Sequence, residues 1–196
     1  MNNIILKEGF NPILIALAIS VFVVVFISTS LGKVLLLFTF FLIFIYRNPS
    51  RYIFQNTQNI LSLVDGKVSA IDKVDDKYKI YCKVNMCNVH TVRAPIDSTI
   101  KVIEHKHGQH LNPYSYKAKL FNEQLKLQFD DMEVEFISGI CNGNINLPSK
   151  LEVKQGDDIL TFLDGLVIIT IDTKYTLEVD ISDKLVAGQT VLYKKI

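Results

Sequence analysis

The N-terminal part of the chain contains a long stretch without a charged side chain. The 22 residues Phe10–Leu31 are uncharged and mostly apolar. A helix of this length rises about 1.5 Å per residue and crosses the roughly 30 Å hydrocarbon core of a bilayer. Gly32 and Lys33 interrupt the stretch, and 13 more uncharged residues follow in Val34–Tyr46. The pattern predicts a membrane-embedded helical hairpin with helices over residues 10–31 and 34–46.

Basic residues flank this predicted hairpin unevenly. Lys7 precedes it, Arg47 and Arg51 follow it, and Lys33 alone lies in the predicted turn. Because basic residues concentrate on the cytoplasmic side of membrane helices, we expect both ends in the cytoplasm, in a multi-pass protein of the inner (cytoplasmic) membrane. The apolar stretch is too long for a cleaved signal peptide. The alternative is a single span, with residues 34–46 buried in a soluble core.

Residues 47–196 contain short runs in which apolar and polar residues alternate. Examples are GKVSAID, YKIYCKV and GLVIITI, separated by turn sequences such as Asp164-Gly165. Alternation of this kind between turn signals is typical of β-strands, and a helical pattern is confined to residues 113–122. We therefore expect a mainly β (β-rich α+β) cytoplasmic domain over residues 47–196, behind a membrane anchor over residues 1–46.

Charge and metal-ligand spacing argue against two classes of function. The formal net charge is +1, without the basic excess of nucleic-acid-binding proteins, so we expect no nucleic-acid partner. His105, His107 and His110 lie close in sequence, but no carboxylate accompanies them at a regular spacing, so we predict no metal site. The chain has three cysteines: Cys82, Cys87 and Cys141. They lack the paired spacing of a zinc site, and we interpret them as reduced thiols.

Four motifs follow the predicted hairpin in a fixed order. They are YRNPSR (46–51), LSLVDGKV (61–68), NVHTVRAP (88–95) and DISDKLVAGQTVL (180–192). In this order they resemble the motifs of the short bacterial and archaeal phosphatidylserine decarboxylases, and the stretch GQHLNPYSYKAKLFNEQ is similar to another part of that family. The resemblance covers nearly the whole chain. It implies a carboxy-lyase of phospholipid biosynthesis that meets its phospholipid substrate at a membrane.

The resemblance also assigns roles to individual residues. In the family, an aspartate and a histidine of these motifs activate a serine, the chain splits, and a pyruvoyl cofactor remains as the electron sink for decarboxylation. By resemblance, Asp65 orients His90, and His90 acts as general base and later as proton donor. Arg93 and His107 are implied as substrate-binding residues. Judged alone, a histidine in a strand-like run is more often an ordinary satisfied or surface residue, and Asp65 of Asp-Gly can also be a turn residue.

The serine of the family lacks a direct counterpart. The family pattern GxIxFGSxVDV places its Gly-Ser pair at Thr170-Ile171 or, with a gap of two, at Asp172-Thr173. Ser149 resembles the pair locally but lies earlier in the chain. Thr173, or Thr170, is therefore the candidate nucleophile, although its methyl group and the missing glycine disfavour the reaction. We predict that the chain does not cleave itself.

Three functions are consistent with these patterns. The chain could be an active decarboxylase of phosphatidylserine, or a catalytically degenerate, unprocessed homologue that binds lipid or a partner. The third alternative is a membrane-tethered barrel-sandwich assembly module, which would account for LVAGQTVL but not for NVHTVRAP. We rank the two family relatives above the module. The sequence leaves open the lipid, the activity and a homo-oligomeric assembly.

Overall fold

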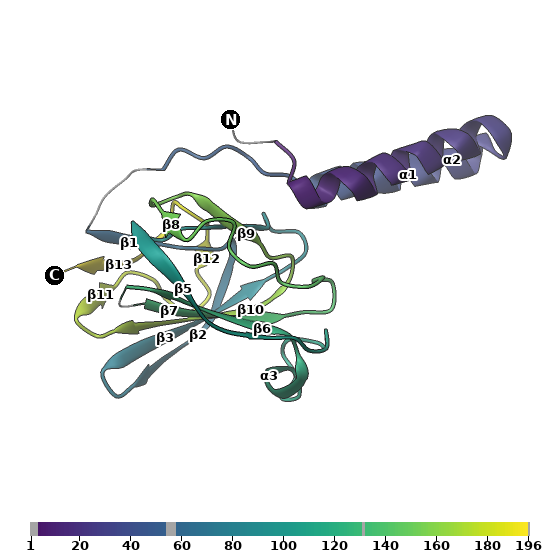
Figure 1. Cartoon of the computed structure of the whole chain (residues 1–196). Coiled ribbons are helices and arrows are strands. Elements are labelled where there is room, and N and C mark those ends of the chain that lie inside the picture. Colours follow the sequence, from purple (N-terminus) through teal and green to yellow (C-terminus); the bar gives the residue numbers. More distant parts are fainter. Residues whose placement is uncertain (1–3, 54–57, 131, 196) are drawn as a thin grey trace. The chain divides into compact units, whose positions relative to one another are not determined.

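A computed structural model describes residues 4–53, 58–130 and 132–195 (Figure 1). The chain divides into two compact units, residues 1–50 and 51–196. Within the described residues, the first unit contains the helices α1 and α2. The second contains the short helix α3 and the strands β1 to β13.

The first unit is a pair of apolar helices, α1 (Lys7–Phe26) and α2 (Thr29–Ile45). Large apolar side chains are exposed along both helices. The Ser20 hydroxyl donates to the Ala16 carbonyl at 2.6 Å and lies 3.2 Å from the Thr39 hydroxyl, so a polar contact joins the helices. By length and composition α1 could cross a membrane, whereas α2 is shorter at 17 residues.

The turn between the helices is not where the sequence pattern places it. The chain reverses at residues 27–28 rather than at residues 32–33. Ser28 caps α2, because its side chain accepts a hydrogen bond from an amide in the first turn. Gly32 instead lies in the helix contact, where a Cβ would be 2.2 Å from a methyl carbon of Val24. The predicted turn is therefore wrong, and the capping serine is the local signal that marks the reversal.

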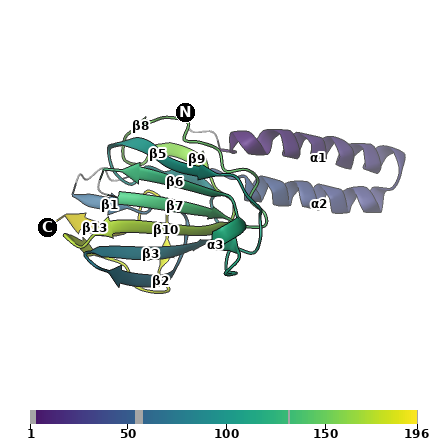
Figure 2. The ribbon, with the colours of Figure 1, turned by 60° about the horizontal axis from the view of Figure 1, so that its bottom comes forward.

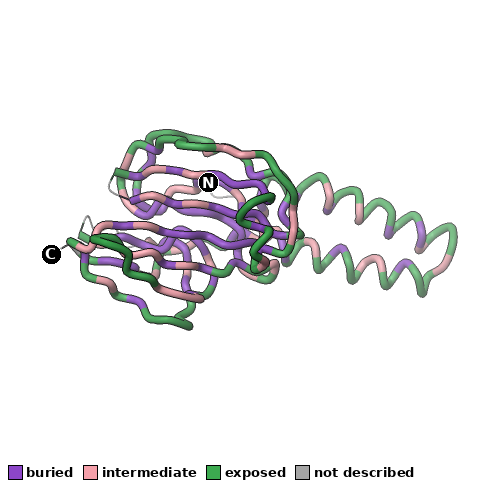
Figure 3. Tube along the Cα trace, turned by 90° about the horizontal axis from the view of Figure 1, so that it is seen from below, coloured by how far each residue is buried: buried purple, intermediate pink, exposed green. Residues whose placement is uncertain are grey.

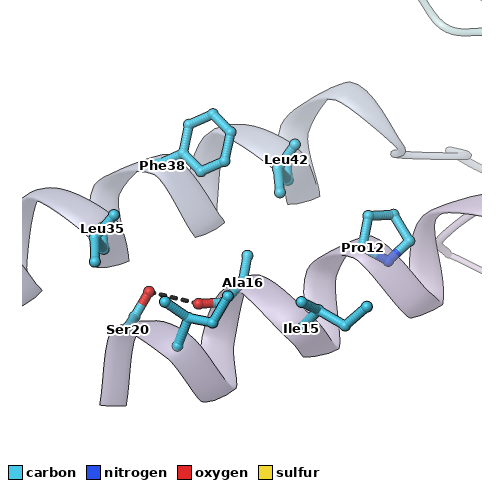
Figure 4. A pocket seen from close by; sticks show the side chains of 8 residues that line it. Pro12, Ile15, Ala16, Ser20, Leu35, Phe38 and Leu42 are labelled. Atoms are coloured by element: carbon cyan, nitrogen blue, oxygen red, sulfur yellow. Dashed lines mark hydrogen bonds between the residues drawn. The ribbon is translucent and has the colours of Figure 1, made fainter. Parts of the chain in front are cut away.

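A groove of about 470 Å³ lies along the pair of helices (Figure 4). Ile15, Ala16 and Ser20 of α1 line it together with Phe38 and Leu42 of α2. The walls are almost entirely hydrocarbon, since the Ser20 hydroxyl is directed to a backbone carbonyl. Such a surface suits an apolar environment better than water.

The second unit is built on an eight-stranded antiparallel sheet with the order β12-β2-β3-β10-β7-β6-β5-β8 (Figure 2). Its strands are β2 (Gly66–Val74), β3 (Lys77–Val84), β5 (Ser98–Lys106), β6 (Gln124–Phe129), β7 (Met132–Ser138), β8 (Glu152–Val153), β10 (Gly165–Asp172) and β12 (Lys184–Leu185). Strand β10 pairs with β3 on one side and with β7 on the other. The prediction of a β-rich domain is confirmed.

Two smaller sheets, β1-β13-β11 and β4-β9, complete this unit. Their strands are β1 (Asn59–Leu61), β4 (Thr91–Arg93), β9 (Asp158–Thr161), β11 (Tyr175–Leu177) and β13 (Val191–Lys195). Buried residues of all three sheets form one core cluster, for example Ile60 of β1, Phe129 of β6 and Leu160 of β9. Figure 3 shows buried positions along the strands of this unit. The helix α3 (Ala118–Phe121) lies within the helical stretch expected at residues 113–122.

Alternation of side chains decides which face of each strand meets the core. In β6, Leu125, Leu127 and Phe129 are buried, whereas Lys126 and Gln128 between them are half-buried. Side chains two residues apart in a strand point to the same face. The pairing register between strands therefore determines which polar side chains meet at the rim of the core.

Candidate functional site

Three of the sequence motifs meet beside the start of β2. In the loop before β2, the Ser62 amide donates to the Thr190 carbonyl at 2.8 Å, and the Ser62 carbonyl accepts from the Gly188 amide at 2.8 Å. The Leu63 carbonyl accepts from the Arg93 amide at 2.8 Å. These backbone hydrogen bonds join LSLVDGKV to NVHTVRAP on one side and to LVAGQTVL on the other.

Asp65, at the end of this loop, is held by an arginine and a backbone amide. Arg51 Nη1 and Nη2 donate to its two carboxylate oxygens at 2.6 and 2.7 Å. The Ala187 amide donates to Oδ1 at 2.8 Å, and Arg51 also donates to the Ala187 carbonyl at 2.9 Å. The two side chains are only 9% (Arg51) and 13% (Asp65) exposed. A two-pronged ion pair in such a place fixes both side chains in orientation.

Arg93 extends this group of charges into the interior. Its side chain is 1% exposed, and its guanidinium lies 3.6 Å from the Asp158 carboxylate. Burial lowers the pKa of Arg93, while the negative charge of Asp158 opposes that shift. Gly188 passes close to it, since a Cβ there would lie 3.2 Å from Arg93 Cδ, and its φ of 75° favours glycine. We call Arg51, Asp65, Arg93 and Asp158 the Asp65 cluster.

His90 is buried in the segment that leads into β4. Its Nε2 lies 3.0 Å from the Met86 carbonyl oxygen, which can only accept, so Nε2 carries the hydrogen in this contact. The His90 carbonyl accepts from the Phe162 amide at 2.8 Å. The Asp65 carboxylate is hydrogen-bonded to Arg51. The predicted pairing of Asp65 with His90 stays a prediction.

Thr170, one candidate nucleophile, lies within β10 and is paired on both sides. Leu166 of β10 is level with Lys67 at the start of β2, because both residues pair with Lys83 of β3. Thr170 lies farther along β10 by four residues, or about 13 Å at about 3.3 Å per residue. The register therefore places Thr170 toward the end of the sheet opposite to Asp65.

The other two hydroxyl candidates lie outside β10. Thr173 follows the end of β10, and its amide donates to the Asp76 carbonyl at 2.8 Å, still farther from the start of β2. The Ser149 amide and hydroxyl lie 3.0 and 3.1 Å from the Ile159 carbonyl. Ser149 is thus bonded to β9, the strand that also carries Asp158 of the Asp65 cluster.

His107, the second implied substrate contact, lies directly after β5. Its Nδ1 is 3.3 Å from Oε1 of Glu123, and its side chain is 76% exposed. The same Glu123 oxygen lies 2.9 Å from His105 Nε2. The structure therefore pairs His107 with a carboxylate that the sequence pattern does not select, and its contact with substrate stays a prediction.

Sequence patterns also miss Asp164. This side chain is half-buried against Gly139, where an added Cβ would meet its carboxylate at 2.1 Å. Burial raises the pKa of Asp164, while hydrogen bonds from the backbone amides of Cys141 and Asn142 oppose that shift. In the sequence, Asp164-Gly165 resembles an ordinary turn. The only local sign of a role for Asp164 is that this charged residue lies between two apolar runs.

A pocket of about 260 Å³ opens beside the turn before β13. Its lining residues are Tyr52, Asn59, Leu61, Gly188, Gln189 and Val191. The Gln189 side-chain amide donates to the Tyr52 carbonyl across it at 3.2 Å. The pocket adjoins the Asp65 cluster through Gly188, and its mixed lining suits a small polar group.

Comparison with known proteins adds an independent finding. The phosphatidylserine decarboxylase family profile matches residues 37–193. A phosphatidylserine decarboxylase proenzyme of Pelagibacter ubique is 27% identical over 206 aligned positions, 96% of this chain and 95% of that protein. The one of Amoebophilus asiaticus is 28% identical over 183 positions, 86% and 81% of the two chains. That of Ralstonia nicotianae is 35% identical over 94 positions, 45% and 44%.

No solved structure matches the chain significantly. The family match nevertheless runs from within α2 to within β13 and includes every strand of the large sheet. It also spans all four members of the Asp65 cluster. The chain therefore belongs to the phosphatidylserine decarboxylase family.

Proposed function

We propose that this chain is a membrane-anchored member of the family that binds an aminophospholipid without cleaving itself. Family membership supports a role in phospholipid metabolism. The observation that carries the proposal is the position of Thr170. Asp65 lies directly before β2. Thr170 lies about 13 Å farther along the strand direction than the start of β2.

The chemistry of self-cleavage explains why this position matters. A hydroxyl must attack the carbonyl of the residue before it, while nearby groups take up its proton. The backbone around Thr170 is paired with β3 and with β7, in a run of branched residues that favours a continuous strand. These residues do not fit the pyruvoyl group, because that group is made from a serine that follows a glycine.

The proposed binding role uses what the family site retains. The Asp65 cluster holds the loop before β2 against the turn before β13, and the adjoining pocket would receive a polar head group. By resemblance, Asp65 and His90 would take the proton-transfer roles in any processing. His107 stays a proposed substrate contact. Arg93, also implied as a substrate-binding residue, is 1% exposed, so it would act on the substrate by shaping the turn at Gly188.

Intact-mass measurement of the full chain in detergent tests the absence of cleavage. We expect one polypeptide of 22.3 kDa and no carbon dioxide release from phosphatidylserine. A C-terminal fragment with a blocked N-terminus, beginning at residue 170 or 173, would contradict the proposal. A fragment beginning at Ser149 would contradict it as well and would identify a different nucleophile. Loss of such fragments in His90→Ala would then support an active enzyme.

Lipid binding needs a separate test. In phosphatidylcholine nanodiscs, added phosphatidylserine is expected to raise the melting temperature of the full chain, because a ligand of the folded state stabilises it. Gln189→Ala, in the pocket, should reduce the shift, whereas Gln128→Ala on β6 should not. An equal shift with phosphatidylglycerol would reduce the effect to general attraction by anionic lipid.

We further propose that α1 and α2 enter the membrane as a hairpin with both ends in the cytoplasm. The apolar surface of both helices and the basic residues Lys7, Arg47 and Arg51 support this arrangement. Protease added to right-side-out spheroplasts should leave residues 51–196 intact. Degradation of that unit in sealed spheroplasts would reject the topology.

A further inference from the structure

Two histidines and a glutamate meet where β5 ends and β6 begins. Lys106 of β5 pairs with Gln124 of β6, so the residues that flank this pair also face one another. His105 and His107 are two residues apart in an extended segment and point to the same side. Glu123, directly before β6, lies on that side as well. The antiparallel register thus brings Glu123 next to two histidines that precede it by 16 and 18 residues in the sequence.

Their distances match those between the ligands of one metal ion. Oε1 of Glu123 lies 2.9 Å from His105 Nε2 and 3.3 Å from His107 Nδ1, and all three atoms lie within 4.8 Å of one another. In a tetrahedral zinc site with bonds of about 2.1 Å, ligand atoms are about 3.4 Å apart. Small side-chain adjustments are therefore enough to place one ion among the three.

Burial gives the glutamate a reason to hold a cation. Its side chain is 1% exposed, and the Ile145 amide donates to Oε2 at 3.1 Å, which leaves Oε1 facing the two imidazoles. A buried carboxylate is stabilised by a positively charged partner. A metal ion held by both imidazoles would supply that charge. The Ile145 amide also fixes the carboxylate in the way that outer hydrogen bonds orient metal ligands.

We propose that His105, His107 and Glu123 form a binding site for a divalent transition-metal ion, with Zn²⁺ favoured by the two imidazoles and one carboxylate. His107 is 76% exposed, so the ion can enter from solvent and keep an open coordination position on that side. The proposal departs from the sequence prediction of no metal site. It also adds a role as metal ligand to the proposed contact of His107 with substrate.

Metal titration of the full chain tests the site. The protein is prepared in detergent without a histidine tag, treated with chelator, and titrated with Zn²⁺ against a chromophoric competitor. We expect one tight equivalent. His107→Gln should weaken binding at least about tenfold, since even loss of an outer hydrogen-bonding partner has an effect of 10-fold to 100-fold in metal sites. The exposure of His107 makes this variant safe for the fold.

A matched control distinguishes this site from other ligands on the surface. His110 lies in the same segment but contacts the Ser138 hydroxyl at 3.2 Å, so His110→Gln should bind Zn²⁺ like the parent chain. Binding that survives in both His105→Gln and His107→Gln would overturn the proposal. Loss of binding in Cys87→Ser or Cys141→Ser, or a thiolate band in the Co²⁺ spectrum, would assign the metal to the exposed cysteines instead. No stoichiometric binding would also overturn it.

This inference is independent of self-cleavage. The three ligands lie on β5, on the segment after it and before β6, and none is a candidate nucleophile. Metal affinity and intact mass are separate readouts of the same preparation. A cleaved chain that binds Zn²⁺ would contradict only the proposed function, and an intact chain without a metal site would contradict only the present inference.

Discussion

Asp65 and Glu123 are both largely buried carboxylates of the β-rich unit, but their partners differ in kind. Asp65 faces Arg51, whose guanidinium is permanently charged, whereas Glu123 faces the imidazoles of His105 and His107. Each carboxylate also accepts one backbone amide. The arginine keeps its charge across the physiological pH range, whereas imidazoles are also common metal ligands. The first site is therefore suited to holding a loop, and the second to the metal binding proposed above.

The two sites also differ in what they connect. Asp65 bonds to Ala187 across 122 residues of sequence and so ties the start of the large sheet to the C-terminal turn. Glu123 bonds to His105 across 18 residues, within one pair of neighbouring strands. Removing a partner should disturb the fold more at the first site than at the second. Two substitutions test this ordering, and a third extends the comparison to another carboxylate.

The largest effect is expected for Arg51→Ala. The substitution leaves the Asp65 carboxylate, which is 13% exposed, with the backbone amide of Ala187 as its hydrogen-bond donor. Breaking a mostly buried ion pair costs about 3 kcal/mol. Urea unfolding of the full chain in detergent, followed by tyrosine circular dichroism, measures the loss. The control is Lys194→Ala, whose pair with Glu178 is exposed and worth less than about 1 kcal/mol. Equal losses in the two variants would refute the ordering.

A smaller loss is expected for Glu123→Gln. In the parent chain one carboxylate oxygen faces the Ile145 amide and the other faces His105. A glutamine side chain has a single oxygen, so one of these two donors loses its acceptor, at a cost of about 1–3 kcal/mol. The same unfolding experiment measures this loss under metal-free conditions. Glu178→Gln is the exposed control. A loss larger than that of Arg51→Ala would reverse the comparison.

The smallest effect concerns Asp164, a third carboxylate that is held mainly by backbone amides, with the charge of His110 as the weakest influence on its pKa. Burial raises its pKa in the folded chain, so the folded state holds this proton more tightly than the unfolded state. Its contribution to stability is full below the unfolded pKa of about 4 and is lost as the pH rises through the folded pKa. Asp164→Asn should therefore stabilise the chain slightly at pH 7 and leave its stability at acid pH nearly unchanged.

Melting temperature measured from pH 4 to pH 8 checks this prediction. Asp75→Asn, in an exposed turn, is the control and should follow the parent chain at every pH. If Asp164→Asn ran parallel to the parent over the whole range, the raised pKa of Asp164 would play no part in stability.

The apolar helix, the strands and the family relationship can be predicted from the local sequence. The uncharged run Phe10–Leu31 predicts an apolar helix by length alone, and the structure forms α1 over much of it. Alternation in stretches such as LKLQF predicts strands, and β6 alternates in burial as expected. The family motifs identify the chain as a relative before any contact is known. Composition, periodicity and motif order depend on neighbouring residues, so they can be read without a fold.

The partners of charged residues depend on contacts across the chain. From the local sequence, Arg51 indicates which side of the membrane the chain lies on, and Glu123 has no predicted role. In the fold, Arg51 pairs with Asp65, and Glu123 pairs with His105 and His107. The distance of Thr170 from the start of β2 likewise follows from the pairing of β2, β3 and β10. Register is set jointly by turns, bulges and core packing over the whole sheet, and a shift of one residue would turn each side chain to the opposite face. That cooperative choice, absent from any short stretch of sequence, decides which charges meet and where a hydroxyl lies.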